Sequence, residues 1–337
     1  MFYRSNPDSS LIQSITRTMR NVTSRQKKML AISLLGIAIL YLVFVFSAGV
    51  DHFILAAQSL GLSGWLFILL CSLSNYVLRF VRWIFYANTW DHSVTYWLHF
   101  NYYMSAFALT TTPGKAGETV RSLYLSSHGV PYNKSLAMFF TERFLDVIVI
   151  SILATFSLLS IDQYEHFIIP ALFVILVLLF IIRSTLGGKI LQFFIHTLPK
   201  GKIKSTVSYL LLLLNSAREL LTLKKLIPGL LLGFIAWSIQ GVAFFFILQK
   251  MGVNLELSIC MSIYAVSLLA GAISFVPGGI GTTEAVMGLL LLQFNVEPAL
   301  AVAAPIISRI STLWFAVSLG LLSSSYLGYI TPARSSE

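Results

Sequence analysis

Charged residues are scarce in this sequence. Asp, Glu, Lys and Arg together make up 11% of its 337 residues, whereas hydrophobic residues make up 57%. Soluble globular domains carry about 25% charged residues. The composition therefore excludes the soluble class and predicts an all-α polytopic integral membrane protein.

Cysteines and catalytic motifs are also few. Both cysteines, Cys71 and Cys260, fall in apolar runs, which excludes a disulfide framework and a cysteine-based metal site. The six histidines show no ligand spacing, and the sequence contains no Walker-type loop and no Ser-His-Asp arrangement. We expect no metal, no cofactor and a transporter rather than an enzyme, although intramembrane chemistry by carboxylates and arginines stays open.

Long apolar runs are abundant instead. A helix needs about 20 mostly apolar residues to cross a bilayer. The runs of this length cover residues 29–49, 62–82, 135–160, 166–184, 226–249 and 299–328. The sequence thus predicts about six full spans, and the first one is expected to be a retained anchor because no small-residue cleavage motif follows it.

The positive charge of the chain sets its expected orientation. The net charge of +10 lies mostly between apolar runs, which does not indicate nucleic-acid binding. Six basic residues in segment 1–28 and eight in 183–225 contrast with none in the loop 161–166. We expect a multi-pass protein of the cell (inner) membrane with a cytoplasmic N-terminal segment and a cytoplasmic tail, 331–337. The basic, partly amphipathic segment 185–225 is expected on the inner leaflet, with a simple linker as the alternative.

Two segments are apolar but broken by proline and glycine. Residues 93–134 break at "TTPGKAGE", and residues 257–294 break at "VPGGIG". If 93–134 crossed the bilayer once, the basic segment 183–225 would lie outside, against the charge asymmetry. We therefore predict two re-entrant helical hairpins, whose non-helical backbone is buried in protein or lines a watery cavity.

The two breaks resemble each other. Each reads P-G-x-x-G and then an acid, and 26 to 28 residues after the last glycine each has an arginine, Arg143 or Arg309. The halves 29–160 and 166–330 would then be inverted repeats, each with two spans, a hairpin and a third span. Secondary transporters commonly follow this plan and bind their substrate at the repeat interface.

Charges within the predicted spans suggest a polar path. Glu142 and Asp146 share a helix face, and Arg143 can reach Asp146 at i, i+3. The alternative is that this triplet lies at the cytoplasmic interface. "RFVRW", with Arg79, Arg82 and Trp83, is expected to be a cytoplasmic interface anchor.

The breaks themselves suggest anion binding. Lys115, Glu118 and Arg121 follow the first break, where a helix starting near Gly117 would point free N–H groups toward a ligand. In the second break we expect Thr282 and Thr283 to cap a helix, and Glu284 to accept from Arg309 or from a cationic substrate. The alternative is that both motifs are purely structural.

At these residues the sequence resembles the flippase-like membrane family typified by the transmembrane domain of lysylphosphatidylglycerol synthases, the multiple peptide resistance factor proteins. The motifs are "PGKAGETVR", "TERFLD", "VPGGIGTTEA" and Arg309, and the resemblance covers about residues 30–330. It implies movement of a lipid across the bilayer, either an aminoacyl phospholipid or a lipid-linked saccharide. The synthases have an appended soluble aminoacyltransferase domain that this sequence lacks, so we do not expect it to make lysylphosphatidylglycerol itself.

The leading hypothesis is a translocase for a phosphate-bearing lipid. Its alternatives are a membrane glycosyltransferase component acting on a polyprenyl phosphate, and a scaffold whose buried charges pair off and leave no cavity. A homodimer or a partner lipid-modifying enzyme would fit the first hypothesis. The predicted substrate-binding residues are Arg79, Pro113, Gly114, Lys115, Gly117, Glu118, Arg121, Glu142, Arg143, Asp146, Pro277, Gly278, Gly279, Gly281, Thr282, Glu284 and Arg309.

Overall fold

Helices and turns make up all the regular structure in the part of the chain that the computed structural model describes. That part comprises residues 36, 50–158, 173, 177–198 and 201–330. The chain divides into two units, Met1–Ala48 and Gly49–Glu337, and the second contains nearly all of the described residues. The predicted segment 1–28, the first span, most of the span 166–184 and the tail 331–337 lie outside the described residues. The all-α prediction is confirmed for the rest.

The long apolar helices are α3 (Val50–Ala87), α10 (Leu223–Lys250) and the continuous stretch of α13 (Pro298–Arg309), a π-turn at Ile310–Trp314 and α14 (Phe315–Ile330). Within the described ranges, three stretches are long and apolar enough to cross a membrane: Phe53–Ala87, Leu223–Lys250 and Pro298–Tyr329. A bent pair, Val177–Arg183 and Leu186–Thr197 at 66°, brings the number to four if it counts as one span. The count of six spans stays a prediction.

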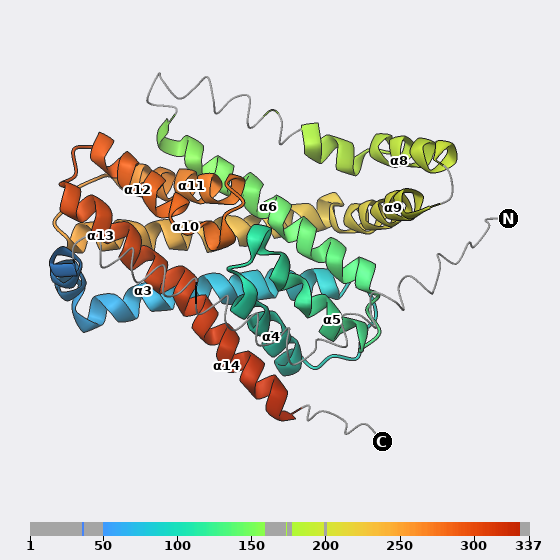
Figure 1. The fold of residues 1–337 in the computed structure, drawn as a ribbon, viewed down its shortest axis with the longest axis horizontal. Coiled ribbons are helices and arrows are strands. Elements are labelled where there is room, and N and C mark those ends of the chain that lie inside the picture. The colour runs from blue at the N-terminus through green and yellow to red at the C-terminus, as the bar shows by residue number, and fades with distance from the viewer. Residues whose placement is uncertain (1–35, 37–49, 159–172, 174–176, 199–200, 331–337) are drawn as a thin grey trace. The chain divides into compact units, whose positions relative to one another are not determined.

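Helix α6 (Tyr132–Leu158) covers residues 135–158 of the predicted span 135–160 and carries the charged triplet. It packs against α10, against α11 (Leu257–Ile273) and against α9 (Lys202–Leu220), while α10 runs alongside α3 (Figure 1). Charged side chains on α6 are therefore covered by neighbouring helices.

Both predicted hairpins fold as helix, break and helix. The first consists of α4 (Tyr96–Ser105), the 3-10 turns Ala106–Leu109 and Pro113–Thr119, and α5 (Val120–Ser126). The second consists of α11, the turn Pro277–Gly279 and α12 (Thr282–Gln293). The two legs of each hairpin pack together, and the turns Pro113–Thr119 and Pro277–Gly279 contact each other. Their re-entrant placement and the inverted repeats remain predictions.

The basic segment 185–225 forms two helices and the start of a third. α8 (Leu186–Thr197) packs on α9, and α10 begins at Leu223 (Figure 1). Arg218 of α9 donates to the carbonyls of Ile182, at 2.9 Å, and Ser184. Arg218, one of the basic residues from which the membrane orientation was predicted, therefore links α9 to the segment that precedes α8.

Two apolar clusters form the core. One gathers around Trp237, Phe244 and Tyr264, and the other around Trp83 and Tyr103. Arg79 touches both, since its guanidinium lies 5.5 Å from the Trp237 ring and 5.7 Å from the ring of Phe107, a member of the second cluster. The buried charges around Arg79 are therefore enclosed by aromatic packing.

Candidate functional site

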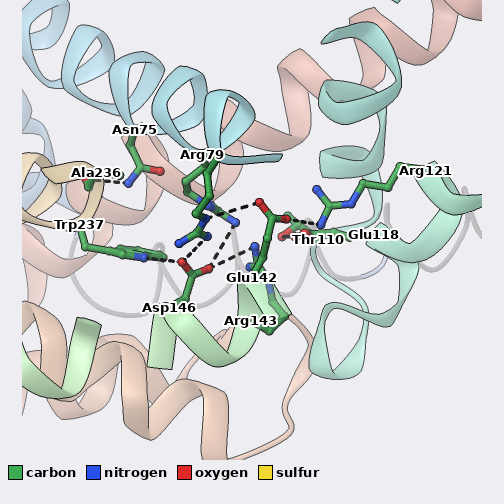
Figure 2. A network of polar contacts seen from close by, with 11 residues as sticks. Asn75, Arg79, Thr110, Glu118, Arg121, Glu142, Arg143, Asp146, Ala236 and Trp237 are labelled. Atoms are coloured by element: carbon green, nitrogen blue, oxygen red, sulfur yellow. Dashed lines mark hydrogen bonds and ion pairs between the residues drawn. The ribbon is translucent and has the colours of Figure 1, made fainter. Parts of the chain in front are cut away.

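The centre of the site is a pair of carboxylates on α6. Asp146 Oδ1 accepts from Arg82 Nη2 at 2.6 Å and from Trp237 Nε1 at 3.0 Å (Figure 2). Its Oδ2 lies 3.2 Å from Arg143 Nη2, which confirms the predicted i, i+3 contact. Glu142, one turn earlier, accepts from Arg121 Nη2 at 2.9 Å. The acids of α6 thus point into the protein interior, toward neighbouring helices.

Two arginines of α3 complete this network. Arg79 and Arg82 are three residues apart, so they share a face of the helix. Arg82 Nε lies 3.6 Å from Glu142 Oε1, and Arg79 Nη2 lies 3.8 Å from Asp146 Oδ2. Arg82 and Trp83 are both 0% exposed. The prediction of an interface anchor at "RFVRW" is therefore wrong, because this face of α3 is covered by α6 and the first hairpin.

Arg121 is part of the network and not a free anion ligand. Besides its bond to Glu142, its guanidinium lies 4.0 Å from the Trp83 ring and 4.7 Å from the Tyr103 ring. The predicted helix start near Gly117 is also wrong. A 3-10 turn occupies Pro113–Thr119, and the Gly117 N–H already donates to Thr112 Oγ1 at 2.7 Å. The acid of this break, Glu118, accepts from Thr110 Oγ1 at 2.8 Å.

The second break is closed by its own acid and arginine. Arg309 Nε donates to Glu284 Oε1 at 3.1 Å, which confirms the predicted pair, and Arg309 also donates to the Gly278 carbonyl. Glu284 Oε2 accepts from the Gly281 N–H at 2.8 Å. This carboxylate therefore caps α12, and the expectation that Thr282 and Thr283 are caps is wrong because no such side-chain bond forms.

Glycine serves close packing at this break. A Cβ at Gly271 would collide with the Thr283 hydroxyl, and Gly279, with φ +64°, lies against both residues. Only glycine has free access to that backbone region. The small residues thus let α11 and α12 meet next to the break.

A cavity of about 240 Å³ reaches both breaks. Its charged wall residues are Lys115, Arg143, Asp146 and Arg309, and its backbone wall includes Gly278 and Gly279. The remaining wall is mostly apolar: Val147, Ile150, Trp237, Leu268, Leu269, Gly271, Ala272, Phe275, Val276 and Leu313, with Thr112 and Thr283. The structure therefore brings six of the predicted site residues to one cavity. The scaffold alternative, which required no cavity at the breaks, is disfavoured.

The other predicted residues are set apart from this cavity. Glu118, Arg121, Glu142 and Glu284 do not line it. Arg79 lines a smaller adjoining space of about 60 Å³, which shares Lys115 and Arg309 with the larger one. Gly117, Pro277, Gly281 and Thr282 belong to the breaks and line neither space. Pro113 and Gly114 belong to the same turn as Lys115.

Backbone strain coincides with the cavity wall. In the described part of the chain, three residues other than glycine have positive φ: Lys115 at 55°, Phe275 at 54° and Asn295 at 58°. Two of these three line the cavity. Such conformations cost about 1–3 kcal/mol and persist where the surrounding structure imposes them, often at functional sites.

Sequence reasoning missed some contacts of the site. Arg82 had a usable signal, since its i, i+3 spacing from Arg79 places both on one face. Trp237 and Thr110 had none, because they meet Asp146 and Glu118 only through the packing of separate helices. Within the described ranges, no group of three His, Cys, Asp or Glu residues is placed to hold a metal ion.

These features define a helical membrane protein with a buried charge network next to a cavity at two helix breaks. The sequence matches the family described as lysylphosphatidylglycerol synthase TM region over residues 31–320. The chain belongs to this family.

Several relatives of the chain are named as membrane proteins. A UPF0104 membrane protein of Pyrococcus horikoshii is 28% identical over 245 residues, which are 65% of this chain and 73% of that protein. Another from Methanocaldococcus jannaschii is 26% identical over 225 residues, 64% of this chain and 92% of that protein. The phosphatidylglycerol lysyltransferase of Staphylococcus xylosus is 28% identical over 92 residues, 27% of this chain and 11% of the lysyltransferase.

Proposed function

We propose that this protein is a translocase that moves a phosphate-bearing lipid across the cell membrane. The observation that carries the proposal is the amphiphilic cavity at the two breaks. Lys115 and Arg143 stand at its polar part, whereas Leu268, Leu269 and Phe275 belong to its apolar wall. A lipid joins a charged headgroup to apolar chains, so such a wall suits both of its parts.

The surface next to the cavity supports the same function. Phe275 is 73% exposed and Ile273 is 75% exposed, at the end of α11 and the second break. In a membrane protein, exposed apolar side chains face the hydrocarbon of the bilayer. A lipid headgroup would enter between this surface and the breaks while its acyl chains stay in the membrane.

Each charged residue then has a role. Lys115 and Arg143 would hold the phosphate, Asp146 and Glu142 would position the arginines, and the Arg309–Glu284 pair would keep the second break closed. Charges at membrane depth are costly and commonly mark substrate or ion pathways. Inverted repeats and cytoplasmic termini belong to this proposal as well.

The relatives support a lipid substrate in a limited way. One of them carries the name phosphatidylglycerol lysyltransferase, and phosphatidylglycerol is a phosphate-bearing lipid. Because the match spans 11% of that protein, lysyl transfer is not carried over to this chain. We also propose that the protein acts as a homodimer or together with a lipid-modifying enzyme.

The test is lipid movement in proteoliposomes. The purified chain is reconstituted with acyl-labelled fluorescent phosphatidylglycerol, and dithionite bleaches the outer leaflet with and without an imposed proton gradient. We expect the bleachable fraction to exceed that of protein-free vesicles. Arg143→Ala should abolish this excess because it removes a cation of the cavity wall, while Lys224→Ala, on the exposed start of α10, should not.

Two results would contradict the proposal. One is a bleachable fraction equal to that of empty vesicles under both conditions. The other is transfer of labelled sugar from a nucleotide-sugar to a polyprenyl phosphate without lipid movement, which would favour the glycosyltransferase alternative.

A further inference from the structure

We propose that Arg143 exchanges between two carboxylates, Asp146 of its own helix and Glu118 of the first break, and that this exchange alternately opens and fastens the first break. The inference rests on the proposed function and describes a change of conformation at the same site. Arg143 Nη2 lies 3.2 Å from Asp146 Oδ2 in the present structure. This is the arrangement in which the first break is open.

The two breaks differ in the acids that are available to their arginines. Arg309 pairs with Glu284, the acid of its own break, and the residue at i+3 from Arg309 is Thr312. Arg143 has an acid at i+3, Asp146, in addition to the acid of its break, Glu118. The arginine of the first break therefore has an alternative partner that the arginine of the second break lacks.

The Arg143 side chain is held more loosely than the other arginines of the buried ion pairs. It is 18% exposed, whereas the side chains of the other four are 7% exposed or less. Within the described ranges, its guanidinium contacts Asp146 and lies 5.8 Å from the Phe139 ring, and both of these residues belong to α6. A change of rotamer could therefore move this guanidinium without breaking a bond to another helix.

Asp146 keeps other partners when Arg143 leaves. Its Oδ1 accepts from Arg82 Nη2 at 2.6 Å and from Trp237 Nε1 at 3.0 Å. Its Oδ2 makes no hydrogen bond and also lies 3.8 Å from Arg79 Nη2. Departure of Arg143 would thus remove one ion pair and leave the carboxylate beside two other arginines.

Glu118, in contrast, has an oxygen that needs a partner. Its Oε1 accepts from Thr110 Oγ1 at 2.8 Å, but its Oε2 is buried and has no hydrogen-bond partner among the described residues. A buried polar atom without a partner is costly. Arg143 is close enough to Glu118 to interact with it electrostatically, and both side chains belong to the network in Figure 2.

Other cations near Glu118 are less suited to fasten the break. Arg121 already donates to Glu142 at 2.9 Å and packs on the Trp83 ring. Lys115 belongs to the same turn, Pro113–Thr119, as Glu118, so a bond between them would not connect this turn to another helix. A bond from Arg143 would connect the turn to α6, as Arg309 connects α13 to the second break.

The exchange would also change the cavity. Arg143 lines the cavity, and Glu118 does not. Pairing with Glu118 would therefore withdraw a cation from the wall and weaken its hold on a headgroup phosphate. A ligand that binds one of two conformations more tightly shifts the equilibrium between them. Headgroup binding and the state of the first break would be coupled in this way.

Hydrogen–deuterium exchange of peptides from residues 110–120, on the purified full-length chain in detergent, tests the change of partner. Asp146→Asn keeps an oxygen for Arg82 and Trp237 but removes the charge that holds Arg143, so Arg143 should move to Glu118. We expect deuterium uptake at the first break to slow about tenfold, since a hydrogen bond between charged groups is commonly worth that factor or more.

A double variant makes this result specific. Adding Glu118→Gln to Asp146→Asn removes the charge of the second partner, while the Gln oxygen can still accept from Thr110. The slowing should then disappear. A simple loss of structure would speed uptake in both variants. Uptake in Asp146→Asn that is not slower than in the parent, or slowing that persists in the double variant, would overturn the exchange.

Glu118→Gln alone tests the exchange in the vesicle assay, without any change at Asp146. It should slow the movement of labelled phosphatidylglycerol at least about tenfold. It should change the affinity for this lipid, measured by native mass spectrometry, by a smaller factor because Glu118 does not line the cavity. Glu297→Gln, on the exposed residue before α13, is the matched control and should change neither value.

These measurements separate the two proposals. Movement in the Glu118→Gln variant at the parent's rate would overturn the exchange and leave translocation in place. Absence of movement with the parent itself would overturn translocation, and the uptake of deuterium in detergent would still decide whether Arg143 changes partner.

Discussion

At the scale of single residues, the buried charges of α3 and α6 act mainly through their pairing. Ion pairs taken out of water gain little net stability, because desolvation offsets their attraction. Removing one partner is different, since it leaves an uncompensated charge. Arg82, at 0% exposure, lies between Asp146 and Glu142. Its loss would remove a cation that both carboxylates share and leave Glu142 with Arg121, and Asp146 with Arg79 and Arg143.

Arg82→Ala should therefore destabilise the protein by about 3–5 kcal/mol, even though Arg82 does not line the cavity. The measurement is the unfolding temperature of the purified protein in detergent, compared with Lys224→Ala. A double variant, Arg82→Met with Asp146→Asn, should recover part of the loss because it removes a charge of each sign. An unfolding temperature of Arg82→Ala within error of the parent's would contradict the buried pair.

The sequence allowed part of this residue-scale description to be predicted. Contacts along one helix followed from spacing, as for Arg143 with Asp146, and the Arg309–Glu284 pair followed from the paired motifs. The aromatic surroundings of Arg121 and the Trp237 bond did not, because no periodicity reports which separate helices meet. For the same reason, the sequence did not reveal that other helices cover Arg82, and the residue was predicted to be an interface anchor.

At the scale of elements, the two hairpins share the order helix, break and helix, but the acid of each break binds different partners. The second break is fastened by Glu284, which binds both Arg309 and the Gly281 N–H. In the first, Glu118 binds Thr110 of the preceding leg, while Arg143, the counterpart of Arg309 by spacing, pairs with Asp146. The positions of the breaks were predictable from proline and glycine, but this difference arises from packing.

The meeting of α11 and α12 depends on the absence of a side chain at position 271. Gly271→Ala should destabilise the second hairpin by about 1–3 kcal/mol, as overpacking commonly does, because its Cβ would collide with the Thr283 hydroxyl. Hydrogen–deuterium exchange of the peptides around 271–284 should rise. Gly328→Ala, where a Cβ would have nothing within 4 Å, is the control.

A second substitution sharpens this test. Combining Gly271→Ala with Thr283→Ala removes the colliding hydroxyl, so exchange should return toward the parent's. If the double variant exchanges as fast as Gly271→Ala, the collision with Thr283 is not the cause.

At the scale of the whole molecule, hydropathy and charge patterning predicted the membrane class, which the family confirms. They predicted six spans, whereas three helical stretches of the described residues are long and apolar enough to cross a membrane. One reason is that α6 carries a charged triplet. The other is that two of the predicted runs lie largely outside the described ranges. Orientation rests on charge asymmetry only.

Cysteine labelling tests that orientation. Cys71 and Cys260 are buried, so the parent should label weakly. Gln192→Cys on the exposed surface of α8 should react with an impermeant maleimide only after permeabilisation, because the basic segment is expected inside. Asn254→Cys, in the exposed turn between α10 and α11, should react in intact cells. Labelling of both from the same side would contradict the predicted path of α10.

The left-handed backbone at Lys115 and Phe275 has a practical consequence for anyone engineering this protein. Glycine would adopt those conformations without the cost that other residues incur, so a screen for thermostability should favour glycine at both positions. Because stability and activity commonly trade against each other where a site is strained, such a screen would select proteins that are easier to purify and have lost the side chains that face the cavity.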